Sequence, residues 1–349
     1  MQVDWRDRPA PVRVGEELDE KSLRDYLVEH IPDLSGRLTV QQFPSGFSNL
    51  TYLIRFGERD MVLRRPPFGA RIKSAHDMGR EHTILSQLHP VYSRVPIPLH
   101  YCQDTSVLGA PFYVMSRLEG VILRPQMPQD MIPAPELMGR IAGAFVDNLV
   151  DLHAVDFQAA GLGELGRPEG YILRQVEGWS GRYYKSRTDD IIEMDEVASW
   201  LGENRPLESD ATLIHNDYKY DNLILDPADW SRITGVLDWE MATIGDPLMD
   251  LGTALGYWVE GGDPPEIQAL RLSPTNLAGN PTRAELVERY TQRSGRDVSN
   301  ILFYFVYGLF KLAVIVQQIY YRYERGYTQD PRFAGLNAAV RACGRMAIR

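Results

Sequence analysis

The spacing of apolar residues predicts a mixture of helices and strands over the first third of the chain. Apolar side chains recur at helical intervals over residues 18–31 and 75–88, because positions three or four apart share one face of a helix. Short runs rich in β-branched and aromatic residues predict strands around these helices. The predicted strands cover residues 38–43, 51–56, 60–64, 99–102 and 111–118. We therefore expect a sheet that carries two helices.

The rest of the chain is predicted to be mostly helical. Residues 136–153 carry a clear apolar stripe at helical spacing, and further helices are expected near residues 281–294, 298–324 and 331–346. The most apolar stretch, residues 301–316, is shorter than the roughly 20 residues that a membrane-spanning helix needs, and it contains Lys311. A buried helix is the better interpretation of this stretch.

A short hairpin interrupts the helical region. The apolar run Leu223–Leu225 and the run Ile233–Leu237 flank the segment 226–229, which holds Asp and Pro and therefore favours a turn. A hairpin brings its two ends together, so residues just before the first strand should lie close to residues just after the second. Three polar residues occupy these ends, namely Asp217, Asn222 and Asp238.

This set of residues suits phosphoryl transfer, which depends mainly on positioning and charge neutralisation. Asp217 would accept the proton of an attacking hydroxyl group. Asn222 and Asp238 each offer an oxygen to Mg²⁺, which is held by one or two carboxylates together with phosphate oxygens. Lys219 could reach the transferred phosphate. The alternative, a polar turn beside a surface hairpin, requires this spacing to arise by chance.

The same residues resemble known motifs. His215, Asp217, Lys219 and Asn222 resemble the H-x-D-x-K-x-x-N catalytic loop of protein kinases. The segments 237–240, Leu-Asp-Trp-Glu, and 245–251, which begins Gly-Asp-Pro, are more similar to the aminoglycoside phosphotransferase and choline kinase branch of that fold. The resemblance implies that Asp217 is the catalytic base, that Asn222 and Asp238 bind Mg²⁺, and that Asp250 is structural. The sequence of residues 215–222 and 237–247 resembles in particular the corresponding sequence of the phosphotransferase domains found beside acyl-CoA dehydrogenases.

The resemblance implies an α+β, two-lobed, protein-kinase-like fold. Residues 1–118 would form a small N-lobe with an antiparallel sheet, and residues 119–349 a larger, mainly helical C-lobe, with the active site in the cleft between them. The loop between the first two strands is similar to the nucleotide loop of the family, although it has one glycine where a protein kinase has three, and hairpin turns often contain such residues. It comprises Ser45, Gly46, Phe47, Ser48 and Asn49.

Two further nucleotide contacts follow from the resemblance. The family places a lysine at the end of the third strand, where this chain has Arg64. Arginine keeps the positive charge but is not equivalent to lysine. Glu81 lies on the apolar face of the following helix and is expected to pair with Arg64, because a carboxylate on such a face needs a partner. The adenine-binding hinge is expected near Met115, Ser116 and Leu118.

Substrate residues are predicted less directly. The segment 170–185 combines aromatic and positively charged residues, Trp179 and Arg174 among them, and could bind an anionic or ring-bearing substrate or simply pack as a helix. Arg174, Arg182 and Lys185 would fit an anion. The segment after Asp250 often lines the acceptor pocket in the family, which makes Tyr257, Trp258 and Glu260 further candidates.

The amino-acid composition argues against several kinds of binding partner. The formal charge of −10 argues against a nucleic-acid-binding surface. The two cysteines, Cys102 and Cys343, form no zinc or disulfide pattern. Residues 1–14 lack the apolar core of a signal peptide, and we expect a cytoplasmic protein that binds neither membranes nor nucleic acid.

The sequence therefore predicts a kinase that uses ATP, or GTP, with Mg²⁺ and transfers the γ-phosphate to a small hydroxylated acceptor. The resemblance implies a hydroxyacyl or hydroxy-acid acceptor. The alternatives are an aminoglycoside or other amino-alcohol kinase, and a nucleotide-binding pseudokinase, which Arg64 alone favours. A protein kinase is disfavoured because no activation segment ending in Ala-Pro-Glu follows Asp238.

Overall fold

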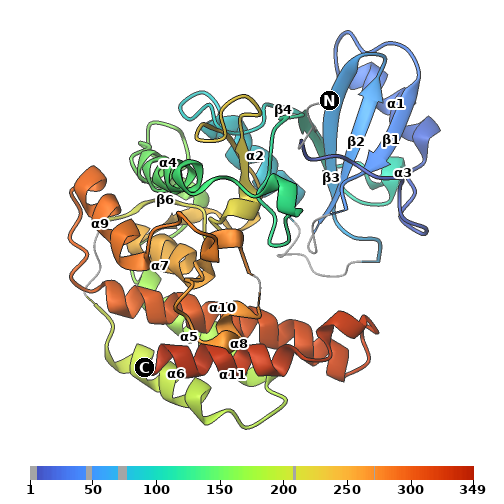
Figure 1. Ribbon diagram of the computed structural model, residues 1–349. Helices are drawn as coiled ribbons and strands as arrows, with labels where there is room; N and C mark the ends of the chain where they lie inside the picture. Colours follow the sequence, from blue (N-terminus) through green and yellow to red (C-terminus); the bar gives the residue numbers. More distant parts are fainter. Residues whose placement is uncertain (1–5, 45–48, 70–76, 207–209, 271) are drawn as a thin grey trace.

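The computed structural model describes residues 6–44, 49–69, 77–206, 210–270 and 272–349. Its N-terminal part is built on one five-stranded antiparallel sheet with the strand order β1-β2-β3-β5-β4, seen at the upper right of Figure 1. The strands are β1 (Leu38–Gln42), β2 (Leu50–Phe56), β3 (Arg59–Arg65), β4 (Pro98–Cys102) and β5 (Phe112–Ser116).

Helices α1 (Glu20–His30) and α2 (Met78–Leu88) pack against this sheet. Asp19 and Asp77 cap them by accepting a hydrogen bond from a backbone N–H in the first turn. Side chains alternate between the two faces of β3. Met61 and Leu63 therefore join α1 in one apolar core, while Val62 packs with α2 in the other. The same alternation puts Arg64 on the α2 side.

The C-terminal part is helical and lies at the lower left of Figure 1. Its main helices are α4 (Pro135–His153), α5 (Tyr171–Ser186), α6 (Ile192–Glu203), α7 (Pro247–Tyr257), α9 (Arg283–Ser294), α10 (Ile301–Glu324) and α11 (Leu336–Ala347), and α8 (Pro265–Gln268) is a short helix of the same part. The short helix α3 (Thr105–Leu108) instead lies between β4 and β5 in the N-terminal part and contacts α1. Two small antiparallel pairs join β7 (Leu223–Leu225) to β8 (Ile233–Val236) and β6 (Thr212–Ile214) to β9 (Thr243–Gly245).

Helix α10 forms the centre of this part and packs on α7, α11 and α5. Its backbone approaches that of α7 very closely, because a Cβ atom added at Gly308 would lie 2.0 Å from the carbonyl oxygen of Gly252. By length and composition α10 could cross a membrane, but 67% of its apolar window is buried inside the protein. This burial agrees with the predicted core helix.

The structure contains the predicted elements with ends shifted by a few residues, and the α+β, two-lobed arrangement agrees with the prediction. Helix α6 and the β6–β9 pair were not predicted. The hairpin of β7 and β8 lies where expected, and Val121 pairs with Leu225. The chain thus joins the hairpin soon after it leaves β5. The boundary between the lobes at residue 118 stays a prediction.

Candidate active site

The loop after β6 carries the proposed base and is held by buried hydrogen bonds. The His215 ring is buried, and its Nε2 donates to the carbonyl oxygen of Leu237 at 2.9 Å. Its Nδ1 then accepts from the N–H of Asp217 at 3.2 Å, as neutral imidazole requires. His215 therefore ties the loop before the hairpin to the residue that precedes Asp238.

Asp250 of α7 fixes the same loop from the other side. Its carboxylate accepts the N–H groups of His215 and Asn216, both at 2.7 Å, and lies 3.2 Å from Nε2 of His153. Burial opposes its charge, but the His153 contact and these donors hold the pKa of Asp250 below its usual value. Asn216 adopts a left-handed backbone, with φ of 66°. This geometry agrees with the structural role expected for Asp250.

Asp217 is oriented through one carboxylate oxygen. Its Oδ2 accepts from Nζ of Lys219 at 2.7 Å and from Nδ2 of Asn222 at 2.9 Å. Burial opposes the charge of Lys219, but Asp217 more than compensates and raises the lysine pKa above its usual value. Lys219 also lies 4.8 Å from the ring centre of Tyr257. The expected base, phosphate ligand and metal ligand of the loop are thus brought together.

Asp238 follows β8 in a left-handed conformation, with φ of 68°. Its Oδ1 lies 2.5 Å from Nη2 of Arg64, which crosses from β3. Burial opposes ionisation of Asp238, yet Arg64 and Lys219 hold its pKa below the usual value. The hairpin therefore does bring Asp217, Asn222 and Asp238 to one place, as predicted.

Arg64 lies among three carboxylates. Nη1 contacts Glu81 Oε1 at 3.1 Å, which agrees with the expected pair, and Nη2 contacts Glu240 Oε2 at 3.2 Å as well as Asp238. Burial opposes its charge, but Glu81 and Asp238 hold the pKa of Arg64 above its usual value. Asn49, the described member of the predicted nucleotide loop, donates to Glu240 at 2.8 Å. Ser45, Gly46, Phe47 and Ser48 lie outside the described residues.

These groups line a cleft of about 400 Å³ between the sheet and the helical part, a size typical of small-molecule sites. Met115, Ser116 and Leu118 line the same cleft, as expected for a hinge. The Ser116 N–H already donates to the carbonyl oxygen of Ile97 at 2.8 Å. A ligand at this hinge would therefore have to use other backbone groups.

The donor set fits Mg²⁺ held together with phosphate. Within the described chain, both hydrogen bonds of the Asn222 amide go through its nitrogen, which leaves the amide oxygen as a ligand. Asp238 adds a carboxylate. The described residues contain no group of three or more His, Cys, Asp or Glu that could hold a metal unaided. Such a site is expected when the substrate phosphates supply the remaining oxygens.

The predicted substrate residues divide into two groups. Tyr257 lines the cleft, while Trp179 and Arg174 line a separate hollow beside the catalytic loop. Two candidates require correction. Trp258 is 1% exposed and packs against Phe145 and Tyr220 in the core, and Glu260 accepts from the backbone N–H of Arg283. Neither lines the cleft, so neither is retained as a substrate residue.

Sequence reasoning missed two residues. Glu240 contacts both Asn49 and Arg64. Its position two residues after Asp238 could have identified it as a residue of the site. Lys311 of α10 is 2% exposed, and its Nζ donates to the carbonyl oxygen of Asn216 at 2.7 Å. The presence of a lysine inside a strongly apolar helix could have indicated a special role for Lys311.

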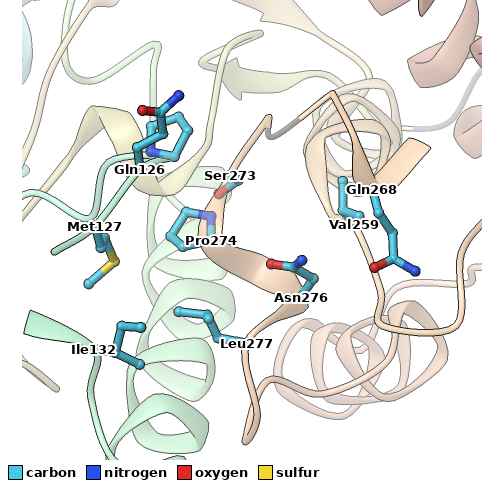
Figure 2. A pocket seen from close by; sticks show the side chains of 10 residues that line it. Gln126, Met127, Ile132, Val259, Gln268, Ser273, Pro274, Asn276 and Leu277 are labelled. Atoms are coloured by element: carbon cyan, nitrogen blue, oxygen red, sulfur yellow. The ribbon is translucent and has the colours of Figure 1, made fainter. Parts of the chain in front are cut away.

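Figure 2 shows a further hollow between the residues that flank η1 (Gln129–Met131) and η5 (Pro274–Asn276). Its volume is about 420 Å³. Its described lining residues carry no charge, and Gln126, Gln268, Ser273 and Asn276 provide the polar side chains. Phosphate transfer needs charge neutralisation, so the cleft that holds Asp217 is the better candidate.

Comparison with known proteins supports this choice. Residues 39–286 match the phosphotransferase enzyme family. Acyl-CoA dehydrogenase family member 11 of Gallus gallus is 36% identical over 328 residues, which cover 91% of this chain and 41% of that protein. The chain thus spans about two fifths of the length of this curated relative.

Solved structures show the same fold. A Ralstonia eutropha protein, provisionally described as an aminoglycoside phosphotransferase, superposes with a TM-score of 0.80 at 29% identity and covers 95% of this chain and 97% of its own. Choline kinase from Cryptosporidium parvum has a TM-score of 0.60 at 13% identity, over 92% and 99% of the two chains. These matches confirm the predicted kinase-like fold and the predicted enzyme class, a phosphotransferase with an alcohol group as acceptor. The chain therefore belongs to the phosphotransferase enzyme family, as the motifs between His215 and Asp250 predicted.

Proposed function

We propose that this phosphotransferase takes its phosphate from ATP with Mg²⁺ and transfers it to the hydroxyl group of a small hydroxyacyl or hydroxy-acid compound. The observation that carries the proposal is the convergence of Asp217, Asn222, Asp238 and Arg64 on one cleft. A base, two oxygen ligands and a cation are the groups that phosphoryl transfer uses.

Each residue has a distinct role in this proposal. Asp217 accepts the proton of the acceptor hydroxyl as the oxygen attacks phosphorus, and Asn222 keeps its carboxylate in place. Lys219, beside Asp217, and Arg64 neutralise phosphate charge. Asn222 and Asp238 hold Mg²⁺, which neutralises the negative charge on the phosphate oxygens when bound. Glu81 positions Arg64.

Two considerations support the acceptor class. The relatives named acyl-CoA dehydrogenase family members match over most of this chain, and their name connects the family branch to acyl chemistry. The surface beside the catalytic loop carries arginine and lysine rather than carboxylates. An acidic surface would suit the cationic amino groups of an aminoglycoside, so the basic surface favours an anionic acceptor.

The test is a phosphorylation assay with purified protein, ATP and Mg²⁺ against a panel of 3-hydroxyacyl and 4-hydroxyacyl compounds, as free acids and as CoA thioesters, with kanamycin and choline as comparators. Product is followed by mass spectrometry, and the Asp217→Asn variant is the control. A phosphorylated hydroxyacyl product that the variant does not form supports the proposal. Phosphorylation of kanamycin or choline alone would contradict the acceptor class.

One observation favours a second function, nucleotide binding without transfer. Arg64 lies 2.5 Å from Asp238 and so occupies a carboxylate that Mg²⁺ would need. If this ion pair persists with nucleotide bound, metal would not enter. Binding of ATP that is indifferent to Mg²⁺, with no product from any acceptor, would identify this function.

A further inference from the structure

A second hollow, of about 360 Å³, adjoins the catalytic loop and concentrates positive charge. Helix α5 contributes much of its lining, α10 contributes Lys311, and the catalytic loop contributes Asn216. Its basic residues are Arg167, Arg174, Arg182 and Lys311. None of the described residues that line it is acidic.

The basic side chains of this hollow form no ion pair with a carboxylate among the described residues. Arg174 donates to the backbone carbonyls of Glu169 and Arg167. Arg182 lies over the Trp179 ring, 4.5 Å from its centre. Lys311 donates to the carbonyl oxygen of Asn216. In a chain whose formal charge is −10, a group of cations without acidic partners is unexpected unless an anion joins it.

Lys311 is the most informative of these residues. It is 2% exposed, and its ammonium group has one hydrogen-bond acceptor among the described residues although it carries three donors. Burial lowers the pKa of Lys311 to about 8, although the carboxylates of Asp217 and Asp250 act in the opposite direction. A bound oxyanion would compensate that charge and satisfy the remaining donors.

The hollow adjoins the active-site cleft. Met241 lines both. Lys311 lines the hollow and Ile315, one turn further along α10, lines the cleft. Asn216 lines the hollow and immediately precedes Asp217. One small molecule could therefore place an anionic group in the hollow and a hydroxyl group at Asp217.

We propose that this hollow is an oxyanion subsite that holds a phosphate or carboxylate group of the phosphate acceptor. The inference rests on the proposed function, because it assigns the acceptor to the same cleft. Lys311 and Arg182 bind the anion, while Trp179 keeps the Arg182 guanidinium stacked in place. The acceptor is accordingly a hydroxyl compound with a negatively charged group.

The subsite is tested by titrating inorganic phosphate, and separately acetate, into the protein saturated with ADP and Mg²⁺, at constant ionic strength. Calorimetry gives the dissociation constant. Arg182→Gln and Lys311→Met are compared with Lys185→Gln, which removes an exposed cation of α5 that does not line the hollow. We expect the first two variants to bind the preferred anion about tenfold more weakly or worse, and the control to bind it as the native protein does. The stronger of the two probes identifies the anion type.

Equal binding by Arg182→Gln and Lys185→Gln would mean an adventitious ion only and would overturn the subsite. So would the absence of any binding to a native protein that still binds ADP and Mg²⁺, an outcome that leaves the proposed function intact. If the native protein does not bind ADP, the proposed function fails, and the same titration without nucleotide still tests the hollow. Because Arg182 is exposed, its variant keeps the test valid even if Lys311→Met does not fold.

Discussion

Nη2 of Arg64 lies 2.5 Å from Oδ1 of Asp238, so the cation expected to bind phosphate pairs with the carboxylate expected to bind metal. The contact joins β3 of the sheet to the residue that follows β8. Arginine can make it while still holding Glu81, because its two terminal nitrogens point to different partners. The proposed binding of Mg²⁺ at Asp238 would therefore compete with an internal ion pair.

Replacing Arg64 by lysine should reduce this competition. A lysine has one nitrogen and cannot hold Glu81 and Asp238 in the same way. We expect the Mg²⁺ concentration for half-maximal ATP binding to fall by roughly threefold to tenfold, the equivalent of about 1 kcal/mol. Fluorescence titration with Mg²⁺ at fixed ATP measures it. Arg55→Lys is the matched control, because Arg55 of β2 forms an ion pair with Asp60 of β3. An unchanged or higher Mg²⁺ requirement in Arg64→Lys would refute the competition.

Asp217→Asn should abolish transfer and leave nucleotide binding intact. The amide cannot accept the hydroxyl proton, and loss of a general base costs roughly 10²-fold to 10⁴-fold in rate. Steady-state ADP release with a phosphorylated acceptor measures the rate. Asp229→Asn, an exposed change in the hairpin turn that does not line the cleft, is the matched control and should cost less than about tenfold. Comparable losses in the two variants would argue against a specific role for Asp217.

Because α7 and α10 cross closely, a single methyl group added at their contact should strongly reduce the stability of the protein. A Cβ at residue 308 would meet the Gly252 carbonyl oxygen at 2.0 Å, and Asp250 and Lys311 lie on these two helices. Gly308→Ala should therefore lower the free energy of unfolding by about 2 kcal/mol or more. In contrast, Gly202→Ala in α6 meets no atom within 4 Å and should be neutral or stabilise by up to about 1 kcal/mol. Urea denaturation measures both, and similar values for the two variants would contradict the crossing.

Lys311 predicts a pH dependence of stability. Its pKa is about 8 in the folded protein and 10.5 for an unperturbed lysine, so between these values the unfolded chain binds more protons. Stability must then rise with pH across this window relative to a chain without the lysine. Between pH 7.5 and 10.5, the free energy of unfolding of the native protein should rise by up to about 3 kcal/mol relative to that of Lys311→Met.

Denaturant unfolding of the two proteins at several pH values provides this measurement. The buried tyrosines ionise in both proteins, so their contribution cancels in the difference. Parallel stability curves would show that Lys311 is not held in an environment that disfavours its charge.

Much of the fold and the centre of the site could be predicted because they depend on local signals. Apolar spacing revealed α4 and α10, and the turn at residues 226–229 revealed the hairpin that brings Asp217 and Asp238 together. The helices and the hairpin are each encoded within a short stretch of chain. The Arg64–Glu81 pair joins two elements, and its prediction needed the family resemblance as well as a carboxylate on an apolar helix face.

The remaining features depend on contacts that local patterns do not contain. The β6–β9 pair joins residues some 30 positions apart along the chain, and its three-residue strands are too short for periodicity to reveal. Trp258 and Glu260 follow the catalytic segment closely in sequence, yet the end of α7 turns them toward the core and toward Arg283. Lys311 donates a hydrogen bond to Asn216, which lies 95 positions away along the chain.

The most direct test of the phosphotransferase site is thermal melting with ATP, with and without Mg²⁺. A ligand that binds the folded state raises the melting temperature. We predict a Mg²⁺-dependent rise of several degrees for the native protein and for Asp229→Asn, an exposed change in the hairpin turn, and its loss in Asp238→Asn. No rise with ATP or GTP, or an equal rise in Asp238→Asn, would contradict the site described here.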